Sequence, residues 1–285
     1  GVVTGQAMVG YRASVDAASD GADAGVNLVG ILFEKGRQSF EASQRDGAIN
    51  VAEACAKAGI DRLVHISAIG ADPESKADYA ETKGEAEQAI REILPSAVIL
   101  KPSIVFGPED DFFNRFASMA SHPISTIAPF LPAIGGGKTK LQPVYAGDVA
   151  EAIAAAVANE DAAGKTYELG GPSIYTFNEL YDFIGETIDR KRYALPLPFV
   201  VAKPVGLAFG TLFRYVWPLS SGILGAPPIT GDQVEMLKTD NVVADGALTL
   251  ADLGITELES VEAIVPSYLY RFRPYGQYHQ KSESV

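Results

Sequence analysis

The sequence predicts an α/β protein with a Rossmann-like, doubly wound parallel sheet and a smaller C-terminal substrate lobe. Apolar strand-like runs alternate with amphipathic helical patterns, which is typical of a parallel sheet covered on both faces. Small or polar residues, namely Gly30, Ser67 and Ser103, follow three of those runs. The 285 residues, of which 47% are hydrophobic, can bury a core of that size. We expect residues 1–170 to form the sheet domain, and residues 171–285 to form the lobe and to return partly to the sheet.

The beginning of the sequence differs from that of a complete dinucleotide-binding fold. Such a fold opens with a strand, a glycine-rich turn and a helix whose N-terminus holds the pyrophosphate. Here an extended stretch over residues 2–11 leads into a helix over residues 13–19, and no Gly-x-Gly-x-x-Gly occurs anywhere. The N-terminal βαβ unit is therefore expected to be missing. Either the sequence is a fragment, the interpretation that we favour, or the pyrophosphate site has been lost.

The next elements follow the alternation of strand and helix. Leu28, Val29 and Gly30 are expected to form the end of a strand, and Gly30 lets the backbone approach a ligand closely. An ordinary buried strand with a turn glycine explains these residues equally well. A loop over residues 31–40 and a crossover helix over residues 48–60 come next, because alanines and other apolar residues recur there at helical spacing.

Residues 62–83 hold the candidate catalytic groups. Leu63–Ile66 reads as a buried strand that ends at Ser67, and a helical pattern follows the polar loop. Tyr79 and Lys83 stand four apart, so that a helix presents both on one face. A nearby ammonium favours phenolate and is expected to lower the tyrosine pKa, while Ser67 can hydrogen-bond a reacting oxygen. The bare spacing is weak, because 12 tyrosines give roughly half a chance Tyr-x-x-x-Lys per chain.

The context of this motif is similar to that in a known family. Another apolar run, residues 97–100, leads into Lys-Pro-Ser-Ile-Val-Phe-Gly-Pro. The strand ending in serine, Tyr-x-x-x-Lys and this Pro-Ser loop together resemble the extended and atypical short-chain dehydrogenases/reductases, the NAD-dependent epimerase/dehydratase-like proteins. The resemblance implies that Tyr79 exchanges a proton, that Lys83 holds the nicotinamide ribose and that Ser67 orients the reacting oxygen. It also implies further cofactor contacts from Leu28, Val29, Gly30, Pro102, Ser103, Ile104 and Val105.

Later segments extend the pattern. Gly-Gly-Gly-Lys-Thr at residues 135–139 is interpreted as a turn rather than a phosphate-binding loop, because its spacing is wrong and no helix follows. Thr176 and Glu179 predict a capping box at a helix start. Residues 199–217 are strongly apolar but include Lys203, Arg214 and a proline, so they cannot span a bilayer. They form either a helix lying on a membrane surface, with Trp217 at the interface, or a buried lobe helix.

The whole pattern resembles one branch of that family more narrowly. Gly-Ile-Leu-Phe-Glu near residue 30, the aromatic run near residue 113 and the segment from Thr230 to Asn241 are similar to the branch that contains the nucleotide-binding alpha-subcomplex subunit nine of respiratory complex I. That resemblance implies bound NADP(H) rather than NAD(H), contacts with complex I subunits and an accessory or assembly role. The residue that discriminates the two nucleotides follows the second strand of such folds and lies outside this sequence.

Two other functions stay open on the sequence. The first is an active NAD(P)-dependent reductase or sugar-nucleotide epimerase/dehydratase that uses Ser67, Tyr79 and Lys83. The second is a structural module that no longer binds a dinucleotide.

Composition excludes several other classes of function. The net charge of −13 and the pI near 4.7 argue against nucleic-acid binding, which needs a basic surface. Three scattered histidines suggest no metal site. A single cysteine, Cys55, fits a reducing compartment. We therefore expect a cytoplasmic protein, with peripheral attachment to the inner face of the cytoplasmic membrane if residues 199–217 bind lipid.

Overall fold

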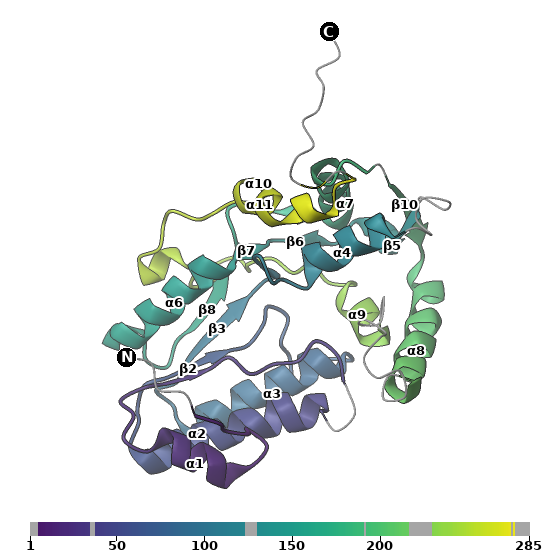
Figure 1. Cartoon of the computed structure of the whole chain (residues 1–285). Coiled ribbons are helices and arrows are strands. Elements are labelled where there is room, and N and C mark those ends of the chain that lie inside the picture. The colour runs from purple at the N-terminus through teal and green to yellow at the C-terminus, as the bar shows by residue number, and fades with distance from the viewer. Residues whose placement is uncertain are drawn as a thin grey trace.

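The structure is a computed structural model that describes residues 5–34, 38–122, 130–190, 192–216, 230–274 and 276. Its main sheet has four parallel strands in the order β1, β2, β3, β8, with helices on both faces (Figure 1). The strands are β1 (Gly25–Asn27), β2 (Leu63–Ile66), β3 (Val98–Pro102) and β8 (Thr166–Leu169). The predicted class, an α/β fold with a doubly wound parallel sheet, is confirmed.

One face of the sheet is covered by the helices that precede β3. They are α1 (Arg12–Ser19), the π-helical turn η1 (Glu41–Asp46), α2 (Gly47–Ala58) and α3 (Asp78–Ile93). Leu63 of β2 packs there against Ala52 and Ile90, which are fully buried. The predicted strand over Leu63–Ile66 and the predicted helix carrying Tyr79 and Lys83 are both confirmed.

The predicted strand over residues 2–11 is wrong for residues 5–11, and residues 1–4 lie outside the described part. Instead of pairing with a strand, the backbone of residues 8–14 forms local hydrogen bonds that lead into α1. Tyr11 N donates to Met8 O at 2.8 Å, and Met8 N donates to Ser14 Oγ at 2.8 Å. Because these hydrogen bonds occupy the backbone groups at the start of the helix, the groups are not available to pair with a strand.

The opposite face of the sheet packs on α6 (Ala146–Ala158). Val64, the residue after Leu63, joins Leu100 and Ala152 in this second core, as the two-residue period of a strand requires. Two short 3-10 turns, η3 (Glu160–Ala162) and η5 (Ala251–Leu253), border it. The chain after residue 240 returns to this region, because Tyr167 of β8 pairs with Leu248.

A separate core fills the second lobe, which lies at the top of Figure 1. Its helical elements are α4 (Phe112–Ser121), α7 (Phe177–Thr187), α10 (Val261–Ile264), α11 (Pro266–Leu269) and η6 (Tyr270–Phe272). Aromatic rings meet edge to face at its centre, for example Phe116 and Phe177 at 5.4 Å. Helix α4 belongs to this core although it precedes residue 171. The predicted capping box of Thr176 and Glu179 begins α7 and is confirmed.

Three short two-stranded sheets lie outside the main sheet. The pairs are β4 (Val105–Phe106) with β7 (Val144–Tyr145), β6 (Lys140–Leu141) with β9 (Tyr175–Thr176), and β5 (Phe130–Ile134) with β10 (Tyr193–Leu197). After β5, Gly135–Gly137 forms the turn η2, in which all three residues have positive φ. The predicted turn is therefore confirmed at these glycines.

The apolar segment forms α8 (Phe199–Val216), which packs against α9 (Gly231–Met236). Of its described side chains, Ala202 is buried, whereas Val200, Val201 and Leu207 are 86%, 49% and 55% exposed. The alternative of a buried lobe helix is wrong for residues 199–208. Within the described ranges, no helix is long and apolar enough to cross a membrane. Trp217 lies outside the described residues.

Candidate functional site

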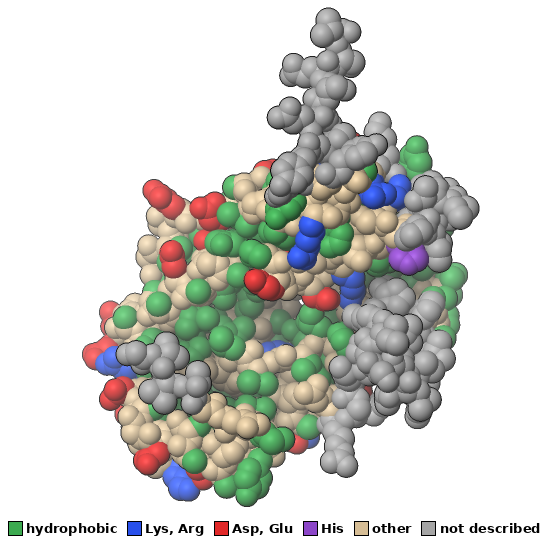
Figure 2. Space-filling view, viewed as in Figure 1, with side chains coloured by type: hydrophobic (Ala, Val, Ile, Leu, Met, Phe, Trp, Pro, Cys, Tyr) green, Lys and Arg blue, Asp and Glu red, His purple; other side chains and the backbone are tan. Residues whose placement is uncertain are grey.

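Three neighbouring strands end at the same edge of the main sheet. Because β1, β2 and β3 are parallel and adjacent, the residues after each strand come together there. The predicted positions Leu28, Val29 and Gly30 follow β1, Ser67 follows β2, and Ser103 follows β3. In the space-filling view, the molecule is hollowed between the half that holds α3 and the half that holds α4 (Figure 2). The structure thus brings these predicted segments together at one edge.

Asn27 determines where β1 ends. Its side-chain oxygen accepts a hydrogen bond from Val29 N at 3.1 Å, and this local turn stops the strand before Leu28. The prediction that residues 28–30 continue the strand is therefore wrong. The amide nitrogen of Asn27 lies 3.1 Å from His65 Nδ1 on β2. Burial, helped by the charge of Lys83, lowers the pKa of His65 to about 3, so this histidine is neutral.

Lys83 is buried beneath this turn. Its ammonium donates to Ile66 O at 2.8 Å, and only 4% of the residue is exposed. A Cβ added to Gly30 would stand 3.4 Å from Nζ, so the glycine leaves room for an approach to the ammonium. Burial lowers the pKa of Lys83 to about 8, although the nearby Glu87 favours the charged form. The result is a desolvated donor group at the edge of the sheet.

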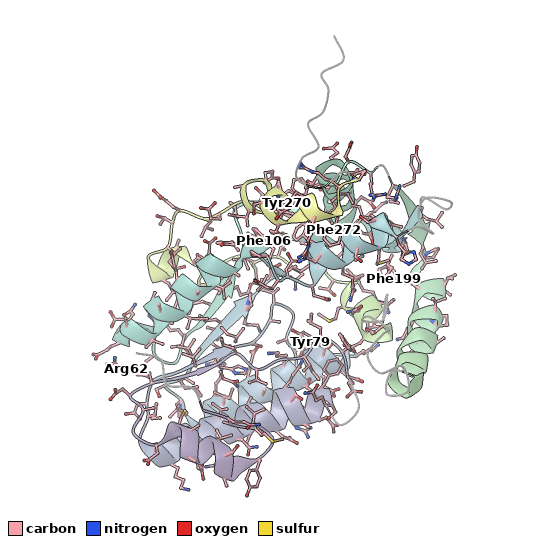
Figure 3. All side chains as sticks on the ribbon, in the orientation of Figure 1. Arg62, Tyr79, Phe106, Phe199, Tyr270 and Phe272 are labelled. Carbon is pink, nitrogen blue, oxygen red and sulfur yellow. The ribbon has the colours of Figure 1, made fainter. Side chains whose placement is uncertain are left out.

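Tyr79 lies one helical turn before Lys83, at the end of α3 nearest α9 (Figures 1 and 3). Its ring packs edge-on against Phe40, with the centroids 5.9 Å apart. Burial of the phenol, together with the charge of Asp232, raises the pKa of Tyr79 to about 12. The expected lowering of the tyrosine pKa by Lys83 is wrong, since that ammonium donates to the Ile66 carbonyl. In the described residues no hydrogen bond joins the phenol to Lys83 or Ser67.

The hydroxyl of Ser67 is bound on the α3 side of the sheet. Ser67 Oγ donates to Glu87, which lies two helical turns beyond Tyr79. Glu87 also pairs with Lys101, with 3.3 Å between Nζ and Oε1, and both side chains are only 14% exposed. Sequence reasoning missed this cluster of Ser67, Glu87 and Lys101. A signal was present, because Tyr79, Lys83 and Glu87 follow one another at a spacing of four on one helix face.

The loop after β3 is held by a residue from far along the chain. Ser103 Oγ donates to Asn241 Oδ1 at 2.6 Å, and Asn241 Nδ2 donates to Ile69 O at 3.0 Å. Pro102 and Ser103 are buried, whereas Val105 is 37% exposed. Asn241 was not among the predicted site residues, since nothing in its local sequence indicates which loop it contacts.

The arrangement is suited to holding a polar ligand against apolar side chains. Lys83 supplies a cationic donor, and Tyr79 supplies a phenol that stays protonated at neutral pH. Leu28 and Val105 are exposed apolar residues that follow β1 and β3. Such a set can bind a ligand that carries both hydroxyl groups and an apolar ring.

Comparison with known proteins identifies the family. Residues 12–170 match the NAD dependent epimerase/dehydratase family. The chain is 34% identical to "NADH dehydrogenase [ubiquinone] 1 alpha subcomplex subunit 9, mitochondrial" of Arabidopsis thaliana over 92% of this chain and 64% of that protein. It is 30% identical to the "NADH-ubiquinone oxidoreductase 40 kDa subunit, mitochondrial" of Neurospora crassa over 88% of this chain and 62% of that protein. The chain thus spans less than two thirds of these relatives.

A solved structure supports the same fold. The crystal structure of gox2253 superimposes with a TM-score of 0.62 and 20% identity, covering 92% of this chain and 82% of that one. At this identity the similarity concerns the fold alone. Because the family match spans more than half of the 285 residues, the chain belongs to the NAD dependent epimerase/dehydratase family.

Proposed function

We propose that this protein binds a nicotinamide dinucleotide at the carboxyl edge of its sheet, and that it prefers NADP(H) to NAD(H). We further propose that it acts as an accessory subunit of an NADH:ubiquinone oxidoreductase assembly. Membership of an NAD-dependent family supports the dinucleotide. The names of the Arabidopsis and Neurospora relatives support the assembly. The preference for NADP(H) rests on the resemblance to the complex I branch.

The observation that carries the proposal is the buried ammonium of Lys83 beside Gly30. Lys83 would donate to the ribose hydroxyls, because Gly30 leaves open the approach to Nζ. Leu28 and Val29 would contact the ligand from one strand end, and residues 102–105 from another. A bound nicotinamide would supply hydride chemistry; the protein residues named here would bind and orient it.

An accessory role is favoured over turnover by the state of the two other predicted catalytic groups. A general acid/base works best when its pKa lies near the working pH, whereas the pKa of Tyr79 is about 12. The Ser67 hydroxyl already donates to Glu87. Within the part of the chain that the structure describes, Lys83 would hold a nucleotide, and no hydrogen bond links the Tyr79 phenol to the Ser67 hydroxyl as a proton-transfer pair.

Identification of the bound nucleotide tests the proposal. The purified full-length protein is denatured, the released nucleotide is identified by mass, and NADPH and NADH are titrated calorimetrically. We expect NADP(H) in the extract, and a loss of affinity of at least about tenfold in Lys83→Met but not in the exposed control Lys165→Met. No nucleotide in the extract and no binding of either one would favour the structural-module alternative.

A substrate panel distinguishes the enzyme alternative. NADPH oxidation is followed with carbonyl and sugar-nucleotide substrates for the natural protein and for Tyr79→Phe. The accessory role predicts that both are equally inactive. Turnover that disappears in Tyr79→Phe would instead identify an active reductase or epimerase.

The exposed apolar face of α8, formed by Val200, Val201, Val205 and Leu207, completes the proposal. Their exposed fractions run from 37% to 86%. Lys203, on the same helix, pairs with Glu235 of α9, with 2.8 Å between Nζ and Oε2. A helix with an exposed apolar face can bury those side chains in a lipid surface. This face would hold the protein peripherally on a membrane beside its partner subunits.

A further inference from the structure

The helix that carries Tyr79 has no N-terminal cap of its own. The residue at the cap position of α3 is Ala77, whose side chain cannot accept a hydrogen bond. The first amides of a helix have no partner within the helix, so Asp78 N and Tyr79 N need an acceptor from elsewhere. The described contacts identify that acceptor in α9, which packs on α8.

Asp232 of α9 accepts these amides. Its Oδ2 lies 3.2 Å from Tyr79 N, although 153 positions separate the two residues, and Asp78 N also hydrogen-bonds the carboxyl group. A carboxylate at a helix N-terminus is favoured by the helix dipole as well as by the N–H donors. Asp232 of α9 therefore caps α3, a helix distant in the sequence.

Asp232 is itself held firmly. It lies in the first turn of α9, which starts with a capping box of Thr230 and Gln233. Gly206 of α8 comes so close that an added Cβ would stand 2.9 Å from Gly231 N. Val234, two residues after Asp232 on α9, is fully buried. These contacts fix the carboxyl group against α3.

The charge of Asp232 acts on the phenol of Tyr79. A negative charge beside a phenol disfavours phenolate, and Asp232 accordingly contributes, after burial, to the raised pKa of Tyr79. Other charged groups near Asp232 are Asp78 and Lys83 on α3, Glu34 in the loop before η1, and Arg115 of α4, whose Nη2 donates to Gln233 Oε1 at 3.4 Å. Burial, followed by Asp78 and Glu34, raises the pKa of Asp232, whereas the two backbone amides oppose that rise.

We propose that Asp232 is a positioning residue for Tyr79. It caps α3 from α9 and fixes the helical turn that carries the phenol. The inference does not require a bound nucleotide, so a failure of the proposed function leaves it standing.

Titration of Tyr79 tests the charge effect. Tyrosines labelled with ¹³C at Cζ are followed by NMR up to about pH 11, and Tyr79→Phe identifies the resonance. In the natural protein we expect Tyr79 to stay a phenol over that range. In Asp232→Asn, which keeps an acceptor oxygen but loses the charge, the pKa should fall towards the ordinary value of about 10. Glu235→Gln, the same charge change one turn along α9, should leave Tyr79 unaltered.

Amide exchange tests the cap. The amides of Asp78 and Tyr79 should exchange slowly in the natural protein and in Asp232→Asn, and rapidly in Asp232→Ala. An unchanged pKa of Tyr79 in Asp232→Asn, or an equal fall in Glu235→Gln, overturns the proposal. So do amides of Asp78 and Tyr79 that exchange equally fast in the natural protein and in Asp232→Ala. Because Asp232→Asn keeps the acceptor, it carries the test even if Asp232→Ala does not fold.

Discussion

At the scale of single residues, the buried ammonium of Lys83 couples folding to pH. Its pKa is about 8 in the folded chain, whereas the ordinary pKa of a lysine is 10.5. Between these two pH values the unfolded chain therefore binds one more proton than the folded chain. Stability then rises with pH across that window, because the unfolded state binds more protons. Below about pH 8 the full penalty of burying the charge is present, and above about 10.5 it has disappeared.

We therefore predict that the natural protein gains stability relative to Lys83→Met as the pH rises from about 8 to 10.5. The gain should be about 3 kcal/mol, because one unit of pKa shift is about 1.4 kcal/mol. Urea unfolding of both proteins at several pH values measures it, and the difference cancels titrations common to both. The exposed Lys165→Met should give no such gain; a pH-independent difference for Lys83→Met would contradict the prediction.

Ser67 provides a second prediction at this scale. Its hydroxyl donates to Glu87, and a hydrogen bond to a charged group contributes roughly 1.5–3 kcal/mol. We expect Ser67→Ala to lower the free energy of unfolding by about that amount and to change dinucleotide affinity by less than about threefold. Urea unfolding and calorimetric titration give the two values.

A double-mutant cycle checks the cause of the Ser67 effect. With Glu87→Gln in the background, Ser67→Ala should lose much of its effect on stability, because the charged acceptor is already absent. Ser96→Ala serves as control, since Ser96 Oγ donates to the uncharged carbonyl of Asp61 on the surface. A large loss of affinity with unchanged stability would instead assign Ser67 to the ligand.

At the scale of elements, α3 is held against the loop that follows β2. Asp72 N donates to Ala80 O at 3.0 Å, and a Cβ added to Gly84 would stand 2.3 Å from Pro73 N. The sequence determined this helix through its periodicity. It did not indicate Gly84 as a contact point, because a glycine in a helix looks locally like a weak helix former.

Gly84→Ala should therefore destabilise the protein although alanine is the better helix former. Propensity alone favours the alanine by about 1 kcal/mol, but the Cβ would stand 2.3 Å from the backbone nitrogen of Pro73, so the loop or the helix would have to shift. We expect a net loss of about 1–3 kcal/mol, as for other overpacked sites, measured by urea unfolding. Gln88→Ala, at an exposed position of the same helix, should stay within about 0.5 kcal/mol of the natural protein. A stabilising Gly84→Ala would show that the loop yields.

At the scale of the whole molecule, the apolar face of α8 gives a prediction about location. Val200 and Leu207 are 86% and 55% exposed. In a density gradient, we expect the protein to float with phospholipid vesicles. The double variant Val200→Glu/Leu207→Glu should remain in the bottom fraction, because a charge in the apolar layer opposes insertion. Ile174→Glu replaces another exposed apolar residue, in the second lobe, and should still float. Equal flotation of all three proteins would contradict lipid binding through α8.

The sequence by itself determined the strand Leu63–Ile66, the helix that presents Tyr79 and Lys83, and the capping box at Thr176. It did so because periodicity and capping are local and involve residues at most a few positions apart. The parallel order of the sheet then placed Gly30, Ser67 and Ser103 at one edge.

Only the tertiary structure decided what these groups contact. Glu87 binds the Ser67 hydroxyl, Asn241 holds Ser103, and Asp232 reaches Tyr79 across 153 positions. Burial and distant charges set the pKa of Tyr79, and no local pattern encodes either.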